Sequence, residues 1–235
     1  MLKIGVRLPR QFEDSGDYLA DARAMDAAGA DSLWLDAEGY DPWLLLAGMA
    51  TITGRVRLVV PISSADVRAP QDLGGRLATL SRLSRGRTAL AVTGLAEALA
   101  DLDAVLELAR RARCCVLLDL PARLGRRGPS PAPASADPRA GLADGVVGAG
   151  ESPEQFRAAV EPVTRYRERE KLTGPFELWA AIKMPDAPET WRRQRQEYEA
   201  AGATGLIVPA DPRLLDLLRN GDEEADRSDL RLAQG

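Results

Sequence analysis

Several polar side chains that could do chemistry stand where strand-like runs of this sequence end. They are Arg7, Asp36, Glu38, Ser63, Ser64, Thr93, Asp119 and Lys183. If the strands run parallel, their carboxyl ends gather on one face, and a ligand would lie over that face. The set offers carboxylates, hydroxyls, one amine and one guanidinium, so it suits ligand binding and polar contacts, and we predict no metal site.

The sequence contains no histidine. This absence excludes serine-histidine and cysteine-histidine catalysis and histidine-ligated zinc. Proton transfer would have to use carboxylates, lysine, tyrosine, a cofactor or water. The two cysteines, Cys114 and Cys115, are adjacent in a strand-like run, where successive side chains point to opposite faces. We therefore predict buried structural thiols and neither a disulfide nor a shared metal.

Eight strand-like runs alternate with amphipathic helical stretches along the whole chain. The runs are Leu2–Leu8, Ser32–Asp36, Val56–Ile62, Arg87–Thr93, Cys114–Leu120, Gly145–Gly148, Phe176–Lys183 and Gly205–Pro209. Several are continuously apolar, as strands buried on both faces should be. The order predicts an α/β fold, a single (β/α)₈ TIM barrel over residues 1–221, with a disordered tail over residues 222–235.

The helical stretches have recognisable faces and ends. The inward faces carry Tyr18, Ala22 and Met25 in the first helix, Phe156, Ala159 and Val163 after Ser152, and Trp191, Tyr198 and Ala201 near the end of the chain. The sequences 27–30 and 200–203 echo each other, each placing a glycine stop before a strand. A helix is expected over Glu97–Arg110, and the proline- and glycine-rich segment Arg123–Asp137 predicts a mobile loop after the fifth strand.

Charge and hydropathy exclude some partners. The chain has 31 basic and 35 acidic residues, a formal net charge of -4 and a pI near 5.1. No field of this sign attracts nucleic acid or an anionic membrane. The first residues lack a secretory signal and no apolar run reaches the length of a membrane span. We therefore expect a cytoplasmic protein.

Three stretches of the sequence resemble the luciferase-like monooxygenase family. The first covers Ala27–Leu35, Asp41–Ala47 and Thr53–Leu58, the second is Leu77–Arg87, and the third is Gly141–Val147 followed by Ser152-Pro153-Glu154. The resemblance implies a barrel that binds flavin mononucleotide (FMN) or the deazaflavin coenzyme F420. In that family a strained bulge after the third strand supports the flavin ring, and Ile62-Ser63-Ser64 has this position here.

The chain also departs from the family pattern at three places. A histidine-proline pair common after the third strand is replaced by Val67-Arg68-Ala69-Pro70. A glycine-rich, phosphate-contacting turn after the fifth strand is replaced by Asp119-Leu120-Pro121, which brings a carboxylate and lacks one backbone N–H. The long excursion after the fourth strand is missing. Replacement phosphate donors would be Arg126 and Arg127, or the backbone of Gly148, Ala149 and Gly150 at a helix N-terminus.

The cofactor contacts that we predict are Arg7, Asp36, Glu38, Ser63, Ser64, Thr93, Gly148, Gly150 and Lys183. Structural roles compete with this prediction, because loop serines usually satisfy turns and Asp36 or Glu38 would pair with Arg7. Two functions remain open. One is an oxidoreductase that uses flavin or deazaflavin on a small organic substrate, by hydride transfer or monooxygenation. The other is a barrel that has lost catalysis and cofactor and binds a ligand or pairs with an active paralogue; either a homodimer or such a heterodimer fits.

Overall fold

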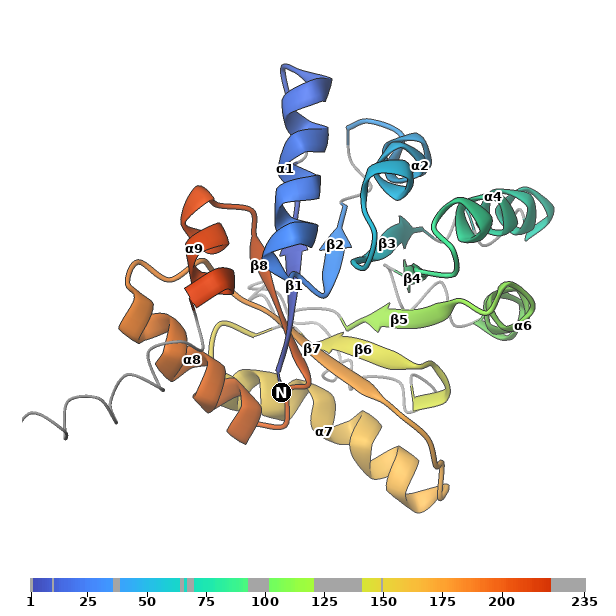
Figure 1. The fold of residues 1–235 in the computed structure, drawn as a ribbon. Helices are drawn as coiled ribbons and strands as arrows, with labels where there is room; N and C mark the ends of the chain where they lie inside the picture. Colours follow the sequence, from blue (N-terminus) through green and yellow to red (C-terminus); the bar gives the residue numbers. More distant parts are fainter. Residues whose placement is uncertain are drawn as a thin grey trace, which may run out of the picture.

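Eight parallel strands close into a barrel in chain order, and β8 pairs with β1 to complete it (Figure 1). The computed structural model describes residues 2–9, 11–35, 39–63, 66, 70–92, 102–120, 141–148 and 150–220. The strands are β1 (Lys3–Arg7), β2 (Ser32–Trp34), β3 (Arg57–Ile62), β4 (Thr88–Val92), β5 (Cys115–Asp119), β6 (Gly145–Gly148), β7 (Glu177–Ala181) and β8 (Gly205–Pro209). All eight predicted runs are confirmed, so the TIM-barrel prediction is confirmed.

The helices lie outside the strands, as Figure 1 shows. They are α1 (Ser15–Ala28), α2 (Pro42–Ile52), α4 (Pro70–Leu83), α6 (Leu102–Ala112), α7 (Pro153–Arg169), α8 (Pro188–Ala200) and α9 (Pro212–Asn220). The predicted inward residues of α1 and α8 are buried, and in α7 Phe156 and Val163 are buried with Ala159 half-buried. The helix predicted to end at Arg110 continues to Ala112, and the sequence before Leu102 lies outside the described residues.

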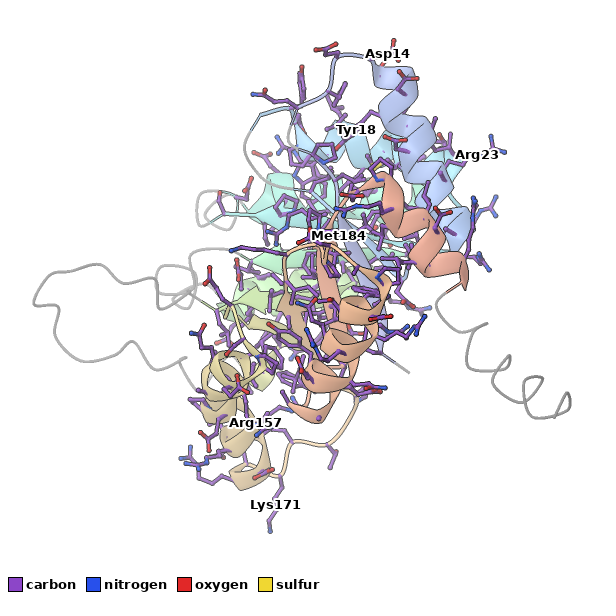
Figure 2. All side chains as sticks on the ribbon, turned by 90° about the vertical axis from the view of Figure 1, so that its left-hand side faces the viewer. Asp14, Tyr18, Arg23, Arg157, Lys171 and Met184 are labelled. Carbon is purple, nitrogen blue, oxygen red and sulfur yellow. The ribbon has the colours of Figure 1, made fainter. Side chains whose placement is uncertain are left out.

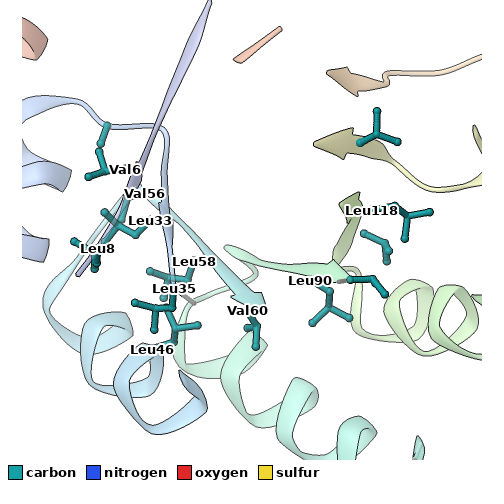
Figure 3. Close-up of a cluster of buried hydrophobic side chains, with 14 of the residues drawn as sticks. Val6, Leu8, Leu33, Leu35, Leu46, Val56, Leu58, Val60, Leu90 and Leu118 are labelled. Atoms are coloured by element: carbon teal, nitrogen blue, oxygen red, sulfur yellow. The ribbon is translucent and has the colours of Figure 1, made fainter. Parts of the chain in front are cut away.

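The larger hydrophobic core fills the space between the strands and the helices. Figure 3 shows part of it, including Val6, Leu33, Leu58, Leu90 and Leu118, whose side chains leave their strands on the outer face. A period of two along each strand sends the alternate residues into the barrel. This explains why the strands are apolar on both faces.

The barrel interior is filled by a smaller cluster around two tryptophans. Trp34 and Trp179 meet edge to face, with ring centroids 5.6 Å apart. Each indole N–H donates a 2.8 Å hydrogen bond to the residue two positions earlier on its own strand, Ser32 or Glu177. The interior is therefore a packed core with its buried donors satisfied, as small barrels require.

The register of neighbouring strands is fixed by the polar residue that precedes a strand. The Asp31 carboxylate accepts a 2.7 Å bond from Ile4 N, and the Asp144 carboxylate accepts a 2.8 Å bond from Val116 N. The Thr204 hydroxyl accepts a 2.8 Å bond from Leu178 N. In each case the polar residue just before a strand accepts a hydrogen bond from the second residue of the preceding strand. A slip in register between the two strands would break this bond.

The echo between 27–30 and 200–203 is a repeated helix ending. Gly29 and Gly202 both have left-handed backbone, with φ of 96° and 97°, which glycine adopts without strain. After Gly29 the next amide bonds back to Met25 O, and after Gly202 it bonds back to Tyr198 O. The same chain reversal thus delivers Asp31 and Thr204 to their register bonds.

Arg87 holds together the turn between α2 and β3. Its guanidinium donates to the carbonyls of Ala50, Thr53, Val56 and Ser84 and to the Thr53 hydroxyl, at 2.7–3.2 Å. Burial of the charged group lowers the pKa of Arg87. The Leu77–Arg87 stretch is therefore scaffold, on the barrel face that contributes stability rather than chemistry.

Cys114 is buried and Cys115 half-buried, and burial raises the pKa of each thiol to about 12, as expected of structural thiols. No described helix is long and apolar enough to cross a membrane. The predicted loop Arg123–Asp137 and tail 222–235 lie outside the described residues.

Replacing Arg87 by alanine should destabilise the protein by about 2–4 kcal/mol, because several buried carbonyls lose their donor together. Arg87→Lys should recover only part of this, since an ammonium cannot reach the same set of acceptors in one plane. Urea unfolding monitored by circular dichroism measures both values. Full stability of Arg87→Ala would contradict the scaffold role.

Candidate functional site

The carboxyl ends of the strands form the candidate site, because the loops that follow parallel strands all open on this face of a barrel. Arg7 ends β1 on the inner side and is half-buried. Ser63 follows β3, and Lys183 follows β7 by two residues. Asp36, Glu38, Ser64 and Thr93, also predicted to contact a cofactor, lie outside the described residues, so the structure leaves their roles as predictions.

Ser63 is held by a neighbouring carboxylate. Its backbone N and its Oγ both donate to Asp66 Oδ2, at 2.9 and 2.8 Å. This is the turn-satisfying arrangement expected of many loop serines. The hydroxyl oxygen still has lone pairs, so Ser63 can accept a bond from a ligand but its proton is committed to Asp66.

The positions of Gly148 and Gly150 have no room for a side chain, because α7 packs closely against them. A Cβ on Gly148 would lie 2.7 Å from the Phe156 ring, and one on Gly150 would lie 2.8 Å from Phe156 N. Their main role in this structure is to let the helix approach β6. Their contact with a cofactor phosphate stays a prediction.

The N-terminus of α7 satisfies its own donors. Gln155 N donates to Ser152 Oγ at 3.3 Å, and the Gln155 side chain accepts from Glu151 N at 2.8 Å. This reciprocal arrangement resembles the capping box predicted from the sequence. Two donors that an anion would otherwise use are thereby occupied.

A second helix N-terminus at this face, that of α9, is occupied by a carboxylate. Asp211 accepts from Arg213 N and from the Arg213 guanidinium, at 2.8–2.9 Å. These hydrogen bonds hold the pKa of Asp211 at about 2. The negative charge of Asp211 stands where a phosphate would have to approach α9.

Among the predicted cofactor contacts that the structure describes, Lys183 provides the amine. Its Nζ lies 3.6 Å from Glu151 Oε1, and both side chains are highly exposed, Lys183 at 90%. Exposed pairs of this kind contribute little to stability, so the ammonium can exchange Glu151 for an anionic ligand at small cost. Asp119 lies at the end of β5 on the inner face, opposite in charge to Lys183.

Three aromatic rings form a chain beside the loops after β1 and β2, and of these the sequence analysis named only Tyr18, as a packing residue of α1. Phe12 stacks on Tyr18 with centroids 4.3 Å apart and leans against Tyr40 at 4.7 Å. The Tyr18 hydroxyl donates to Pro9 O at 3.1 Å, which fixes the buried end of the chain of rings. Figure 2 shows Tyr18 near the Asp14 end of α1. Tyr40, at the outer end, is 49% exposed.

This aromatic cluster (Phe12, Tyr18, Tyr40) was difficult to find from sequence. Phe12 and Tyr40 stand in different loops, 28 positions apart, and neither follows a helix or strand period. The one available signal was that each is a large ring four positions after the end of a strand-like run, in a loop that would normally carry polar residues.

The opposite end of the barrel interior holds an ionic cluster of Glu177, Arg57 and Lys3. Glu177 accepts from Lys3 Nζ at 2.5 Å, from Arg57 Nη1 at 2.6 Å and from Trp179 Nε1 at 2.8 Å. Burial disfavours the carboxylate and by itself would raise the pKa of Glu177, but these hydrogen bonds outweigh it and hold that pKa at about 2. The cluster lies at the amino ends of the strands, so we assign it to stability.

Comparison with known proteins bears on what the strand-end face binds. A model of the luciferase-like monooxygenase family matches residues 5–111. The match covers less than half of the chain, and over those residues the sequence is similar to that family. Two of the three stretches on which the resemblance rests fall inside the match, and the third, beginning at Gly141, lies beyond it. A search of curated proteins gave no match.

Solved structures share this chain's fold at low identity. The coenzyme F420 dependent tetrahydromethanopterin reductase from Methanopyrus kandleri is 13% identical, with a TM-score of 0.70, over 94% of this chain and 98% of the reductase. An F420-dependent secondary alcohol dehydrogenase is 14% identical with a TM-score of 0.63, covering 93% of this chain and 96% of that one. A monooxygenase from Streptomyces bottropensis is 18% identical with a TM-score of 0.57, covering 95% and 82%.

The described residues of this barrel fit one part of a flavin-type coenzyme, its planar ring, better than the other part, its phosphate. The exposed face of Tyr40, supported by Phe12, offers a surface for a planar ring. For a phosphate the fit is weaker, because the N-termini of α7 and α9 are satisfied from within the chain. Among the described residues with a predicted role, Lys183 is the exposed cation that remains for an anion.

The ionic cluster predicts how stability depends on pH. The folded pKa of Glu177 lies below the ordinary value of 4.5, so its ionisation stabilises the fold above pH 4.5, and this stability is lost as pH falls toward 2. Glu177→Gln should lower the free energy of unfolding at pH 7 by about 2–3 kcal/mol, because Arg57 keeps its partly buried charge without a partner.

Denaturant unfolding of both proteins between pH 7 and pH 2.5 measures this effect. The difference between wild type and Glu177→Gln should shrink as the pH falls below 4.5. A difference that stays constant over this range would contradict the assignment of the charge to Glu177.

Proposed function

We propose that this chain binds a flavin-type coenzyme, F420 or FMN, at the carboxyl ends of its strands and is an oxidoreductase for a small organic substrate. The reaction is hydride transfer or monooxygenation. The observation that carries the proposal is the luciferase-like match over residues 5–111, which contains β2, β3, β4 and the carboxyl-terminal part of β1, and hence the ends of half of the strands that build this face. The fold likeness to F420-dependent enzymes supports it.

The packed interior supports the placement of the coenzyme. Trp34 and Trp179 fill the barrel beneath the strand ends, so a ligand cannot enter the barrel and must lie on the loops. When bound, the coenzyme supplies the redox chemistry, which the protein side chains do not provide. This division of roles is compatible with a chain that has no histidine.

The protein's own residues orient the ring and its substituents. Tyr40 stacks on a planar ring, and the Phe12–Tyr18 pair keeps Tyr40 from turning away. Ser63 Oγ accepts a hydrogen bond from the ligand while its own proton stays on Asp66. Lys183 contacts a negative substituent at the far side of the face, after releasing Glu151.

The second candidate function is a barrel without catalysis that pairs with an active paralogue. The internally satisfied N-termini of α7 and α9 favour it, because they remove two of the places where a barrel usually binds phosphate. The two functions differ in one measurable property, which is saturable binding of a coenzyme.

Titration with F420, FMN and riboflavin tests the proposal. Tryptophan fluorescence should fall with a saturable dependence on coenzyme, because Trp34 and Trp179 lie inside the barrel and can transfer excitation to a ring bound at its carboxyl end. The phosphate of FMN should improve binding over riboflavin by less than about 100-fold, worth about 2.7 kcal/mol, since the described helix N-termini offer it few donors.

Failure of all three compounds to bind would favour the non-catalytic subunit. A phosphate effect above this limit would show a strong phosphate site and overturn our account of α7 and α9. Lys183→Ala should then be compared with Lys171→Ala, an exposed lysine after α7, to show whether Lys183 supplies the contact.

Tyr40→Ala should weaken coenzyme binding by about 3- to 10-fold, the range expected when one aromatic stacking contact is lost. Tyr40→Phe should restore it, because stacking needs the ring and not the hydroxyl. Leu142→Ala removes a side chain of similar exposure from the opposite face and is the matched control. Equal affinities for Tyr40→Ala and wild type would remove Tyr40 from the site.

A further inference from the structure

The side chains that point into the barrel form levels, and the ionic cluster shows which strands face each other. The inward residues at the amino ends of β1, β3, β5 and β7 are Lys3, Arg57, Cys115 and Glu177. The Arg57 guanidinium donates to the Glu177 carboxylate at 2.6 and 3.1 Å, although β3 and β7 are four strands apart in the closed barrel. These two side chains therefore meet across the interior. TIM barrels generally fill their interior with such levels of four side chains from alternate strands.

The same four strands build a second level at the strand-end face. Four positions further along each strand stand Arg7, Pro61, Asp119 and Ala181. Because side chains alternate along a strand, these residues point into the barrel like those of the ionic cluster. Their neighbours Val6, Val60 and Leu118 belong to the outer core between strands and helices (Figure 3). We call this set of four residues the upper level.

The upper level is open toward the strand ends and closed from below. Two positions earlier on their strands, Val59, Leu117 and Trp179 are buried and fill the barrel. Arg7 and Asp119 are only half-buried, so solvent reaches them from the strand-end side. The other two members of the level have no polar side-chain atom. A ligand that lies over the strand ends therefore meets one guanidinium and one carboxylate at the mouth of the barrel.

Arg7 and Asp119 lie on opposite sides of this mouth, because β1 and β5 are opposite strands just as β3 and β7 are. An aspartate is shorter than a glutamate by one C–C bond, about 1.5 Å, so Asp119 extends less far across the barrel than Glu177 does. Each of the two residues has at least one interaction within the chain. A guanidinium has several N–H donors and a carboxylate several lone pairs, so one partner does not saturate either group.

The two charged groups select a ligand by its hydrogen-bonding pattern. A guanidinium only donates and a carboxylate only accepts, so a ligand that bridges Arg7 and Asp119 needs an acceptor and a donor close together. The ring that riboflavin, FMN and F420 share has such an edge, an imide in which one N–H lies between two carbonyl oxygens. A phosphate is anionic and is repelled by Asp119. The edge of the ring therefore matches the upper level, and the phosphate does not.

We propose that Arg7 and Asp119 bind the imide edge of the coenzyme ring, with Asp119 accepting from the ring N–H and Arg7 donating to a carbonyl oxygen beside it. The proposal rests on the coenzyme binding proposed above and gives the ring a direction, with its imide edge toward the barrel. Tyr40, on the loop after the neighbouring strand β2, then stacks on the face of the ring while the upper level holds its edge. Hydrogen bonds to charged groups are the stronger kind, so this edge contributes to affinity as well as to orientation.

Binding of riboflavin and 3-methylriboflavin to the wild-type chain tests the proposal without a mutation. The methyl group replaces the imide hydrogen and leaves both carbonyl oxygens in place. Titration followed by flavin fluorescence should give a dissociation constant about 10-fold higher, or more, for 3-methylriboflavin, because a carboxylate loses its donor. Asp119→Ala should bind both compounds equally, since alanine has no acceptor and leaves room for the methyl group. Asp119→Asn keeps an acceptor oxygen and should keep part of the difference.

Two further variants separate the roles of the upper level. Arg7→Met should weaken both compounds by the same factor, about 3- to 10-fold, because both retain the carbonyl oxygens that Arg7 contacts. Asp186→Ala removes an exposed carboxylate from the loop after β7 and is the matched control for Asp119→Ala. It should keep the wild-type difference between the two compounds. Thermal unfolding midpoints show that each variant is folded.

The outcomes distinguish the ring-edge proposal from the function on which it rests. If riboflavin, FMN and F420 all fail to bind, the proposed coenzyme function is overturned and the ring-edge proposal with it. If riboflavin binds and 3-methylriboflavin binds equally well, the coenzyme function stands and the ring-edge proposal is overturned. A difference that persists in Asp119→Ala assigns the ring N–H to another acceptor and overturns the role of Asp119.

Discussion

The fit of two tryptophans against glycines inside the barrel is the constraint on which the rest of this structure depends. A Cβ on Gly5 would collide with the Trp34 indole, and a Cβ on Gly205 would lie 2.5 Å from the Trp179 ring. The glycines stand on strands that pair directly with the tryptophan strands. Because the interior is closed by this packing, it can hold neither a channel nor a ligand, and the useful surfaces of the molecule are its loops and the outer sides of its helices.

The same constraint separates the two ends of the barrel. At the amino ends, the Glu177 carboxylate accepts a hydrogen bond from the Trp179 indole of the interior and also pairs with Arg57 and Lys3. At the carboxyl ends, the described groups are a tied serine, an exposed lysine and the aromatic cluster. A cluster whose central carboxylate is mostly buried and paired with two cations resists change, whereas exposed and loosely paired groups can exchange partners with a ligand. We therefore propose ligand binding at the carboxyl ends and a stabilising role for the amino ends.

Sequence reasoning was sufficient for the elements and insufficient for contacts between distant residues. Runs such as Val56–Val60 could be assigned as strands because burial on both faces makes the run continuously apolar. Gly29 and Gly202 could be assigned as helix ends because glycine is the residue that most often ends a helix. The partners of Glu177 could not be assigned from the sequence, since Arg57 is 120 positions away from Glu177 and Lys3 is 174 positions away. The contact between Phe12 and Tyr40 could not be predicted for the same reason, because the two residues come together only in the folded chain. Gly148 and Gly150 were predicted as anion donors, but their closeness to Phe156 depends on how α7 sits, which no local pattern specifies.

The glycine–tryptophan fit also limits how the interior of this barrel can evolve. A larger residue at Gly5 or Gly205 is tolerated only if the facing indole becomes smaller, and a smaller residue at Trp34 or Trp179 leaves a void that only a larger neighbour can fill. Neither single step is neutral, so divergence at these positions must proceed by compensated pairs. Relatives that have changed one member should therefore have changed the other, and the interior should drift far more slowly than the loops above it.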